Sequence, residues 1–183
     1  LQWIADFRDP WTTIGYHSAL KLTQKSRQRH LTLEKDVLNS ADQLVVTSYQ
    51  TREEFEQKTQ VPIEVITNGY AELAVDVELS ENFTVSHIGS LLNDRNPKAL
   101  WEVISEMIEE NPIFKDFFEL RLIGKVSESV LSSAYEVGLK PYISVVGYLN
   151  HKDAVESQRS SQMLLLIEID KPETRGIIPG KVF

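Results

Sequence analysis

The chain has 183 residues, of which 42% are hydrophobic and 25% charged, an ordinary composition for one globular domain or two small ones. Its net charge of −8 argues against a nucleic-acid partner, because such binding requires the neutralisation of many phosphates. The absence of cysteine excludes disulfides and thiolate metal sites, and no apolar run approaches the roughly 20 residues of a membrane span. This composition fits a reducing compartment, and we expect a cytoplasmic protein.

The first third of the chain alternates short apolar runs with helical patterns. The predicted strands are residues 3–7, 43–47 and 63–67, and the predicted helices are 18–40 and 51–56, the second capped by Ser48. Asp9 directly follows the first strand, at the edge where open α/β sheets bind ligands. Because Asp-Pro is also a common turn, Asp9 has two interpretations, a turn former and a ligand-binding residue.

An acidic segment without periodicity, residues 70–82, separates this part from a second alternating part. The second part has predicted strands at 83–88, 117–123, 142–146 and 163–169, with helices at 97–110, 127–137 and 151–160. Such alternation indicates an α/β protein with two Rossmann-like parallel-sheet units, residues 1–75 and 76–183, of which the first is partial and the second nearly complete. The chain begins without methionine and stops as a helix begins, so we expect it to be an interior piece of a longer protein.

The stretch Thr84–Asn96 combines a buried strand, Gly89 at its carboxyl end and a short loop that carries Arg95. Asn96 is expected to cap the next helix, with Pro97 at its first position. Arg95 then lies beside a helix amino terminus, where backbone N–H groups favour an anion. This is a candidate phosphate site, although a single arginine near a helix start is often only solvated.

Two further loops are expected at the same edge of the second sheet, Gly147–Asn150 and Glu168–Lys181. Lys181 follows Pro179 and Gly180 and repeats the arrangement of Arg95, a cation beside the start of a helix. Two cations at two helix starts would suit a diphosphate.

The order and spacing of these segments resemble the retaining GT-B glycosyltransferases of the glycogen-synthase-like class (glycosyl transferases group 1). Residues 87–95, 147–155 and 175–183 look like the basic loop, the base-binding loop and the approach to the ribose-binding helix of the donor domain. Residues 41–48 and 65–69 resemble the end of the acceptor-side domain, which would place Asp9 on the acceptor side. The resemblance therefore implies a GT-B fold, with the acceptor-side domain ending near residue 75 and the donor-binding domain following it.

The resemblance also implies the roles of individual residues. Arg95 takes the position of the basic residue that stabilises the diphosphate, and Lys181 is a second candidate for this catalytic role. The implied donor-binding residues are Gly89, Ser90, Arg95, Gly147, Tyr148, Leu149, Glu173, Arg175, Gly176, Gly180 and Lys181. The implied reaction uses a nucleotide-diphosphate sugar as donor and a glycan or lipid-linked acceptor, with no metal and no cofactor.

Two positions depart from the family pattern. Ser90 stands where many members carry a second cation, and Gly176 stands near the place of the first motif glutamate, for which Glu173 is the nearest acid. We expect this piece alone to transfer no sugar, and we expect the missing part of the acceptor domain to provide any peripheral association with the cytoplasmic face of a membrane. The alternatives are a nucleotide-sugar epimerase of the same fold and a non-catalytic nucleotide- or sugar-binding domain.

Overall fold

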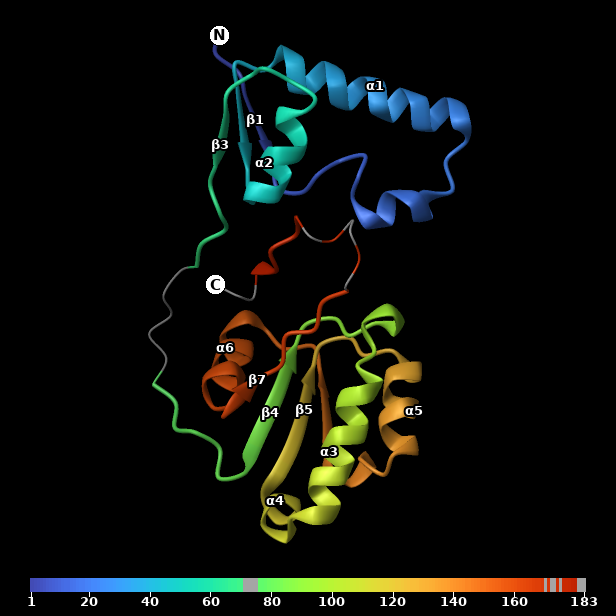
Figure 1. Ribbon diagram of the computed structural model, residues 1–183. Coiled ribbons are helices and arrows are strands. Elements are labelled where there is room, and N and C mark those ends of the chain that lie inside the picture. The colour runs from blue at the N-terminus through green and yellow to red at the C-terminus, as the bar shows by residue number, and fades with distance from the viewer. Residues whose placement is uncertain (71–75, 170, 172–173, 175, 181–183) are drawn as a thin grey trace. The chain divides into compact units, whose positions relative to one another are not determined.

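The computed structural model describes residues 1–70, 76–169, 171, 174 and 176–180, and the chain forms two compact units (Figure 1). The first unit comprises Leu1–Ala71 with Asp170–Phe183, and the second comprises Glu72–Ile169. Each unit is built on a parallel sheet, so the predicted fold class is confirmed. The domain boundary at residue 75 stays a prediction, and residues 170–183, which were expected in the second domain, group with the first unit.

The first unit contains a three-stranded parallel sheet in the order β1–β2–β3. Its elements are β1 (Ile4–Phe7), the 3₁₀ helix η1 (Gly15–Leu20), α1 (Gln24–Ser40), β2 (Gln43–Val46), α2 (Tyr49–Glu56) and β3 (Ile63–Val65). Leu44 and Val46 of the central strand are fully buried and share a core with Leu38 of α1 and Phe55 of α2. The two helices thus bury their apolar sides against the sheet.

The long helix predicted over residues 18–40 is wrong at its start, because the structure divides this segment in two. Lys21 adopts a left-handed conformation with φ 49°, which ends η1, and α1 begins three residues later. The side chain of Thr23 accepts a hydrogen bond from the backbone N–H of Ser26 and caps α1. The cap at Thr23 therefore starts α1 later than the helical pattern of the sequence predicts.

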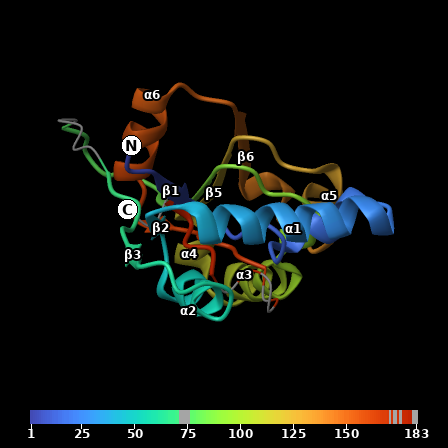
Figure 2. The same cartoon turned by 90° about the horizontal axis from the view of Figure 1, so that it is seen from above.

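The second unit contains a four-stranded parallel sheet in the order β6–β5–β4–β7. Its elements are β4 (Phe83–Ile88), η2 (Asn93–Arg95), α3 (Lys98–Glu110), α4 (Pro112–Phe117), β5 (Phe118–Ile123), α5 (Glu128–Glu136), η3 (Lys140–Tyr142), β6 (Ile143–Gly147), α6 (His151–Arg159) and β7 (Met163–Leu164). Figure 2 shows α3 and α6 on opposite sides of β5, as right-handed crossovers require when one runs from β4 to β5 and the other runs in the opposite direction from β6 to β7. The core between the sheet and α3 includes the fully buried Trp101 and Leu120.

Two boundaries differ from the sequence prediction in this unit. The short helix α4 precedes β5 and was not predicted; the side chain of Asn111 caps it by accepting from the backbone N–H of Phe114. The last strand was predicted over 163–169, but β7 is limited to Met163–Leu164. None of the helices in the described ranges has the length and apolar character that a bilayer crossing requires.

Candidate functional site

Three neighbouring strands of the second sheet end in glycines at its carboxyl edge. Gly89, Gly124 and Gly147 follow or end β4, β5 and β6, and their φ angles are +123°, +107° and +79°. Residues other than glycine rarely adopt such φ angles. At Gly147 no atom lies within 4 Å of an added Cβ, so a ligand can approach the main chain closely there.

The backbones at this edge are hydrogen-bonded to one another. The N–H of Gly89 donates to the carbonyl of Ile123 at 2.8 Å, and the N–H of Gly124 donates to the carbonyl of Gly147 at 2.6 Å. A Cβ atom added to Gly124 would lie 2.5 Å from the carbonyl oxygen of Gly89, far inside van der Waals contact. Gly124 is thus required by packing as well as by its φ angle, although the sequence analysis did not select it.

The loop after β4 runs beside the segment that follows β5 before it reaches Arg95. Leu91 forms a parallel bridge with Val126, and its carbonyl accepts from the N–H of Ser127 at 3.0 Å. The side chain of Leu91 is fully buried in the core. This anchoring fixes the base of the loop, and the short helix η2 then carries Arg95 at its end.

Arg95 forms an ion pair with Glu168, which lies in the segment after β7. The Nη2 atom of Arg95 is 3.4 Å from the Oε2 atom of Glu168, and the two side chains are 32% and 33% exposed. The segment is held by β4, because the N–H of Leu165 donates to the carbonyl of Ser86 at 2.8 Å. The pair joins two loops of one sheet edge, as parallel strands predict.

The sequence analysis did not identify Glu168 as a site residue. The available signal was its position as the first acid after the apolar run that ends at Ile167. A carboxylate competes with a phosphate for a guanidinium. An anionic ligand must therefore share the guanidinium of Arg95 with Glu168 or displace Glu168 from it.

The expected cap at the start of α3 is wrong. The side chain of Asn96 accepts a hydrogen bond from the indole Nε1 of Trp101 at 3.0 Å, and it also bonds the hydroxyl of Ser133 on α5. Pro97 takes the cap position and provides no side-chain hydrogen bond. Asn96 therefore joins α3 to α5 rather than closing the helix end, while the loop before it still places Arg95 at the sheet edge.

The remaining candidates of the donor site lie in different surroundings. Ser90 is exposed, and Tyr148, directly after β6, is 93% exposed, with the half-buried Leu149 beside it. Gly176 lies in the first unit, where an added Cβ would come 3.0 Å from the hydroxyl of Thr51. Gly180 lies in the same segment, and Glu173, Arg175 and Lys181 fall outside the described residues. The assignment of all these residues to a donor site stays a prediction.

Asp9 lies at the carboxyl end of β1 in the first unit, as predicted, and lines a pocket of about 390 Å³. Trp11, Tyr16 and the hydrogen-bonded pair of His17 and His30 line the same pocket. Aromatic rings beside a carboxylate and imidazoles suit a sugar, which offers apolar C–H faces and hydroxyl groups. The histidine pair was not anticipated from the sequence.

A buried acidic group supports the segment after β1. Glu34 of α1 is almost fully buried and accepts hydrogen bonds from the N–H and hydroxyl of Thr12 and from Lys58. Lys58 also pairs with Glu54 at 2.6 Å. Burial lowers the pKa of Lys58, but the hydrogen bonds and charges of Glu54 and Glu34 outweigh it, so the pKa is raised above its ordinary value.

The fold has counterparts among solved glycosyltransferases. A mutant of S. aureus TarM in complex with fondaparinux, α-GlcNAc-glycerol and UDP matches 96% of this chain and 34% of its own, with a TM-score of 0.60 and 11% identity. A second TarM structure matches 89% of this chain and 31% of its own, with a TM-score of 0.61 and 11% identity. WaaG, a glycosyltransferase involved in lipopolysaccharide biosynthesis, matches 93% of this chain and 51% of its own, with a TM-score of 0.58 and 12% identity.

No protein-family model and no curated protein matches the chain in sequence. The chain spans about a third of the TarM structures and half of WaaG. At these sequence identities the similarity concerns the fold alone. It agrees with the two units of this chain, each of which contains a parallel sheet. The fold of this chain is that of the GT-B glycosyltransferases, as the sequence predicted.

Proposed function

We propose that the chain is part of a glycosyltransferase that transfers a sugar from a nucleotide-diphosphate sugar to a glycan or lipid-linked acceptor. The observation that carries this proposal is the carboxyl edge of the second sheet, where glycine-ended strands adjoin the loop of Arg95. Bare backbone allows a diphosphate to approach, and a guanidinium can bind phosphate oxygens in a bidentate manner. The shared fold and the UDP bound by S. aureus TarM support the same class of donor.

The proposed chemistry places Arg95 where charge develops. As the bond between the anomeric carbon and the phosphate oxygen breaks, the electron pair stays on the nucleoside diphosphate, and a cation placed there in advance lowers the barrier. Retention of configuration, independence of metal and the roles of Lys181 and the other donor residues are parts of the proposal that rest on the family resemblance. So do a place in cell-envelope polysaccharide synthesis and a cytoplasmic location, and WaaG, which is involved in lipopolysaccharide biosynthesis, supports the envelope role.

The first unit is proposed to hold the acceptor. Its pocket at the carboxyl end of β1 combines Asp9 with Trp11 and Tyr16, and Asp9 and Tyr16 are exposed to solvent there. An aromatic ring can pack on a sugar face while the carboxylate accepts hydrogen bonds from sugar hydroxyls.

Calorimetric titration tests the donor site. UDP and GDP are titrated into the chain, into Arg95→Ala and into Lys115→Ala, a control that removes one cation from exposed α4 before β5, at the opposite edge of the sheet. Loss of charge-assisted bonds to a partly exposed arginine should weaken binding about 5- to 30-fold. The control should change the affinity less than about twofold, because exposed charges at such a distance are screened.

Absence of nucleotide binding, or equal effects of the two substitutions, would count against the proposal. A second candidate is a domain that binds a nucleotide sugar without transferring it, and the exposed Ser90 and the engagement of Arg95 with Glu168 favour this alternative. Such a domain would bind UDP or GDP with the same dependence on Arg95. It would release no nucleoside diphosphate from a nucleotide sugar when the complete protein is assayed.

A further inference from the structure

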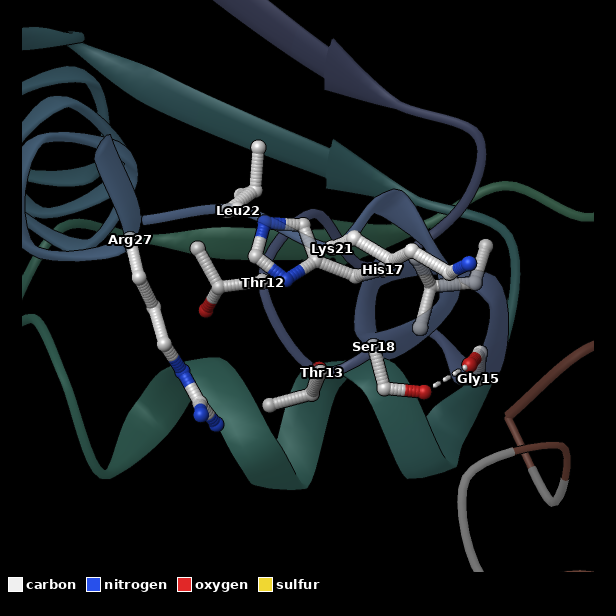
Figure 3. A pocket seen from close by; sticks show the side chains of 9 residues that line it. Thr12, Thr13, Gly15, His17, Ser18, Lys21, Leu22 and Arg27 are labelled. Carbon is white, nitrogen blue, oxygen red and sulfur yellow. Dashed lines mark hydrogen bonds between the residues drawn. The ribbon is translucent and has the colours of Figure 1, made fainter. Parts of the chain in front are cut away.

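A second hollow of the first unit, of about 420 Å³, lies between the segment after β1, the helix η1 and the first turn of α1 (Figure 3). Its lining residues are Thr12, Thr13, Ile14, Gly15, His17, Ser18, Lys21, Leu22 and Arg27. Lys21 and Arg27 are its two cations, and Figure 3 shows them reaching from different sides with the ring of His17 between them. The charged groups of a ligand would therefore meet the protein at two separate points.

Both cations are available to a ligand. Among the described residues, neither the ammonium of Lys21 nor the guanidinium of Arg27 has a hydrogen-bonding or ion-pair partner, although the chain has eight more acidic than basic residues. Lys21 is also the one non-glycine residue in the described ranges with a positive φ. This left-handed residue ends η1 and thereby sets the position from which Lys21 borders the hollow.

The hydroxyl groups of the hollow face a ligand as acceptors. The hydroxyl of Thr12 donates to Glu34 at 2.7 Å, and that of Thr13 donates to Glu54 at 2.8 Å, since a carboxylate can only accept. The hydroxyl of Ser18 donates to a backbone carbonyl of its own turn at 2.9 Å, as Figure 3 shows. Each hydroxyl has one proton, and that proton is already used, so only the oxygen lone pairs remain for a ligand.

The two acids beneath the hollow do not leave it negatively charged. Lys58 forms ion pairs with Glu34 at 3.1 Å and with Glu54 at 2.6 Å. Lys58 thus offsets part of the charge of these two acids, and Lys21 and Arg27 are the charged residues that line the hollow itself. Charged donors at two sides and neutral acceptors between them match a molecule with acidic groups at two points and hydroxyl groups between.

We propose that this hollow binds an anionic sugar or polyol, with its phosphate or carboxylate groups on Lys21 and Arg27 and its hydroxyls donating to Thr12, Thr13 and Ser18. This inference rests on the proposed function in one respect, since it identifies that ligand as part of the acceptor. The acceptor would then be an acidic glycan or a phosphate-linked polyol rather than a neutral sugar. This hollow adjoins the carboxylate and aromatic pocket of Asp9, and His17 lines both.

The test is a set of titrations of the isotope-labelled chain, followed by the amide signals of residues 12–27 in two-dimensional NMR spectra. The probes are fructose 1,6-bisphosphate, glucarate, adipate and sorbitol. Glucarate has two carboxylates and four hydroxyls, adipate is the same diacid without the hydroxyls, and sorbitol is the same polyol without the acids. If the bisphosphate binds more tightly than glucarate, the natural ligand is assigned as a phosphate ester. If glucarate binds more tightly than the bisphosphate, the natural ligand is assigned as a carboxylated sugar.

The variant that tests the site is Lys21→Ala combined with Arg27→Ala. Its matched control is Lys25→Ala combined with Arg29→Ala, which removes the same charge from α1 but from a neighbouring shallow surface. We expect saturable binding of the bisphosphate or glucarate, weakened about tenfold or more in the first variant and less than about threefold in the control. Equal thermal midpoints of the two variants would show that a difference in their binding does not come from a difference in folding. Where the midpoints differ, binding is measured from the amide signals of the folded fraction.

Three results would overturn the proposal: no saturable binding of either anionic probe, equal weakening by the two variants, or adipate or sorbitol binding as tightly as glucarate. Nucleotide titration of the same preparation separates this inference from the proposed function. Absence of nucleotide binding refutes the donor site, whereas the NMR titrations decide the hollow independently.

Discussion

Replacing Gly124 by alanine should destabilise the second unit by more than the cost of a positive φ at a non-glycine residue. The new Cβ would lie 2.5 Å from the carbonyl oxygen of Gly89, and φ at this position is +107°. Relief of the contact requires the ends of β4 and β5 to separate by almost an ångström, which stretches the hydrogen bond from Gly89 N–H to the Ile123 carbonyl. The backbone strain costs about 1–3 kcal/mol and the overpacking a further ~1–3 kcal/mol.

Gly138→Ala provides the matched control for this prediction. Its φ is +84°, and a Cβ there would meet no atom within 4 Å, so it carries the strain without the contact. We expect a loss of about 1–3 kcal/mol for Gly138→Ala and about 2–6 kcal/mol for Gly124→Ala. The difference between the two variants measures the close approach of the strand ends.

Urea denaturation followed by tryptophan fluorescence measures both variants. Trp101 is fully buried in the second unit, so substitution of Trp3 and Trp11 by phenylalanine leaves a signal from that unit alone. The midpoint should fall by about 1 M or more in Gly124→Ala, for a slope of roughly 1–3 kcal/mol per molar urea. Equal midpoints for Gly124→Ala and Gly138→Ala would refute the reasoning.

Three further predictions concern individual contacts. Asn96→Ala should lower the free energy of unfolding of the second unit by about 1–3 kcal/mol, since the buried indole N–H of Trp101 loses its acceptor; urea denaturation measures this, and an unchanged midpoint contradicts it. Glu168→Gln should tighten UDP or GDP binding by about two- to fivefold in calorimetry, because the competing charge on Arg95 is removed; weaker binding would mean that the carboxylate instead positions the arginine. The raised pKa of Lys58 stabilises the first unit at pH values below about 10.5, and this contribution is lost as pH rises above that value through the higher folded pKa; urea midpoints should be steady below about pH 10.5 and fall above it, and a profile that stays flat above pH 10.5 excludes the effect.

Helix caps were predicted correctly from the sequence where the capping side chain bonds a backbone N–H nearby in the chain. Ser48 caps α2 and Asn150 caps α6, each by accepting a hydrogen bond from a backbone N–H three residues later. Both contacts involve neighbours in sequence, so their chemistry could be predicted from spacing alone. Asn96 has the same chemistry at the same kind of position, yet its side chain bonds Trp101 and Ser133 instead.

The difference lies in partners that are distant in sequence. Ser133 belongs to α5, and only the packing of α5 against α3 brings its hydroxyl beside Asn96. Glu168 likewise meets Arg95 because β7 pairs with β4 at the sheet edge, a neighbour relation that the order of elements along the chain does not specify. Long-range pairs of this kind depend on strand order and register.

The sequence by itself determined the alternation of strands and helices, the parallel sheets and the position of Arg95 at a carboxyl edge, because periodicity, glycines and turn residues act over a few positions. The tertiary structure alone decided which strands lie side by side, that Gly124 must accommodate the carbonyl of Gly89, and that Arg95 faces a carboxylate. It also decided that Lys21 and Arg27 border one hollow. These features depend on distances between segments remote in sequence, which only the packed chain fixes.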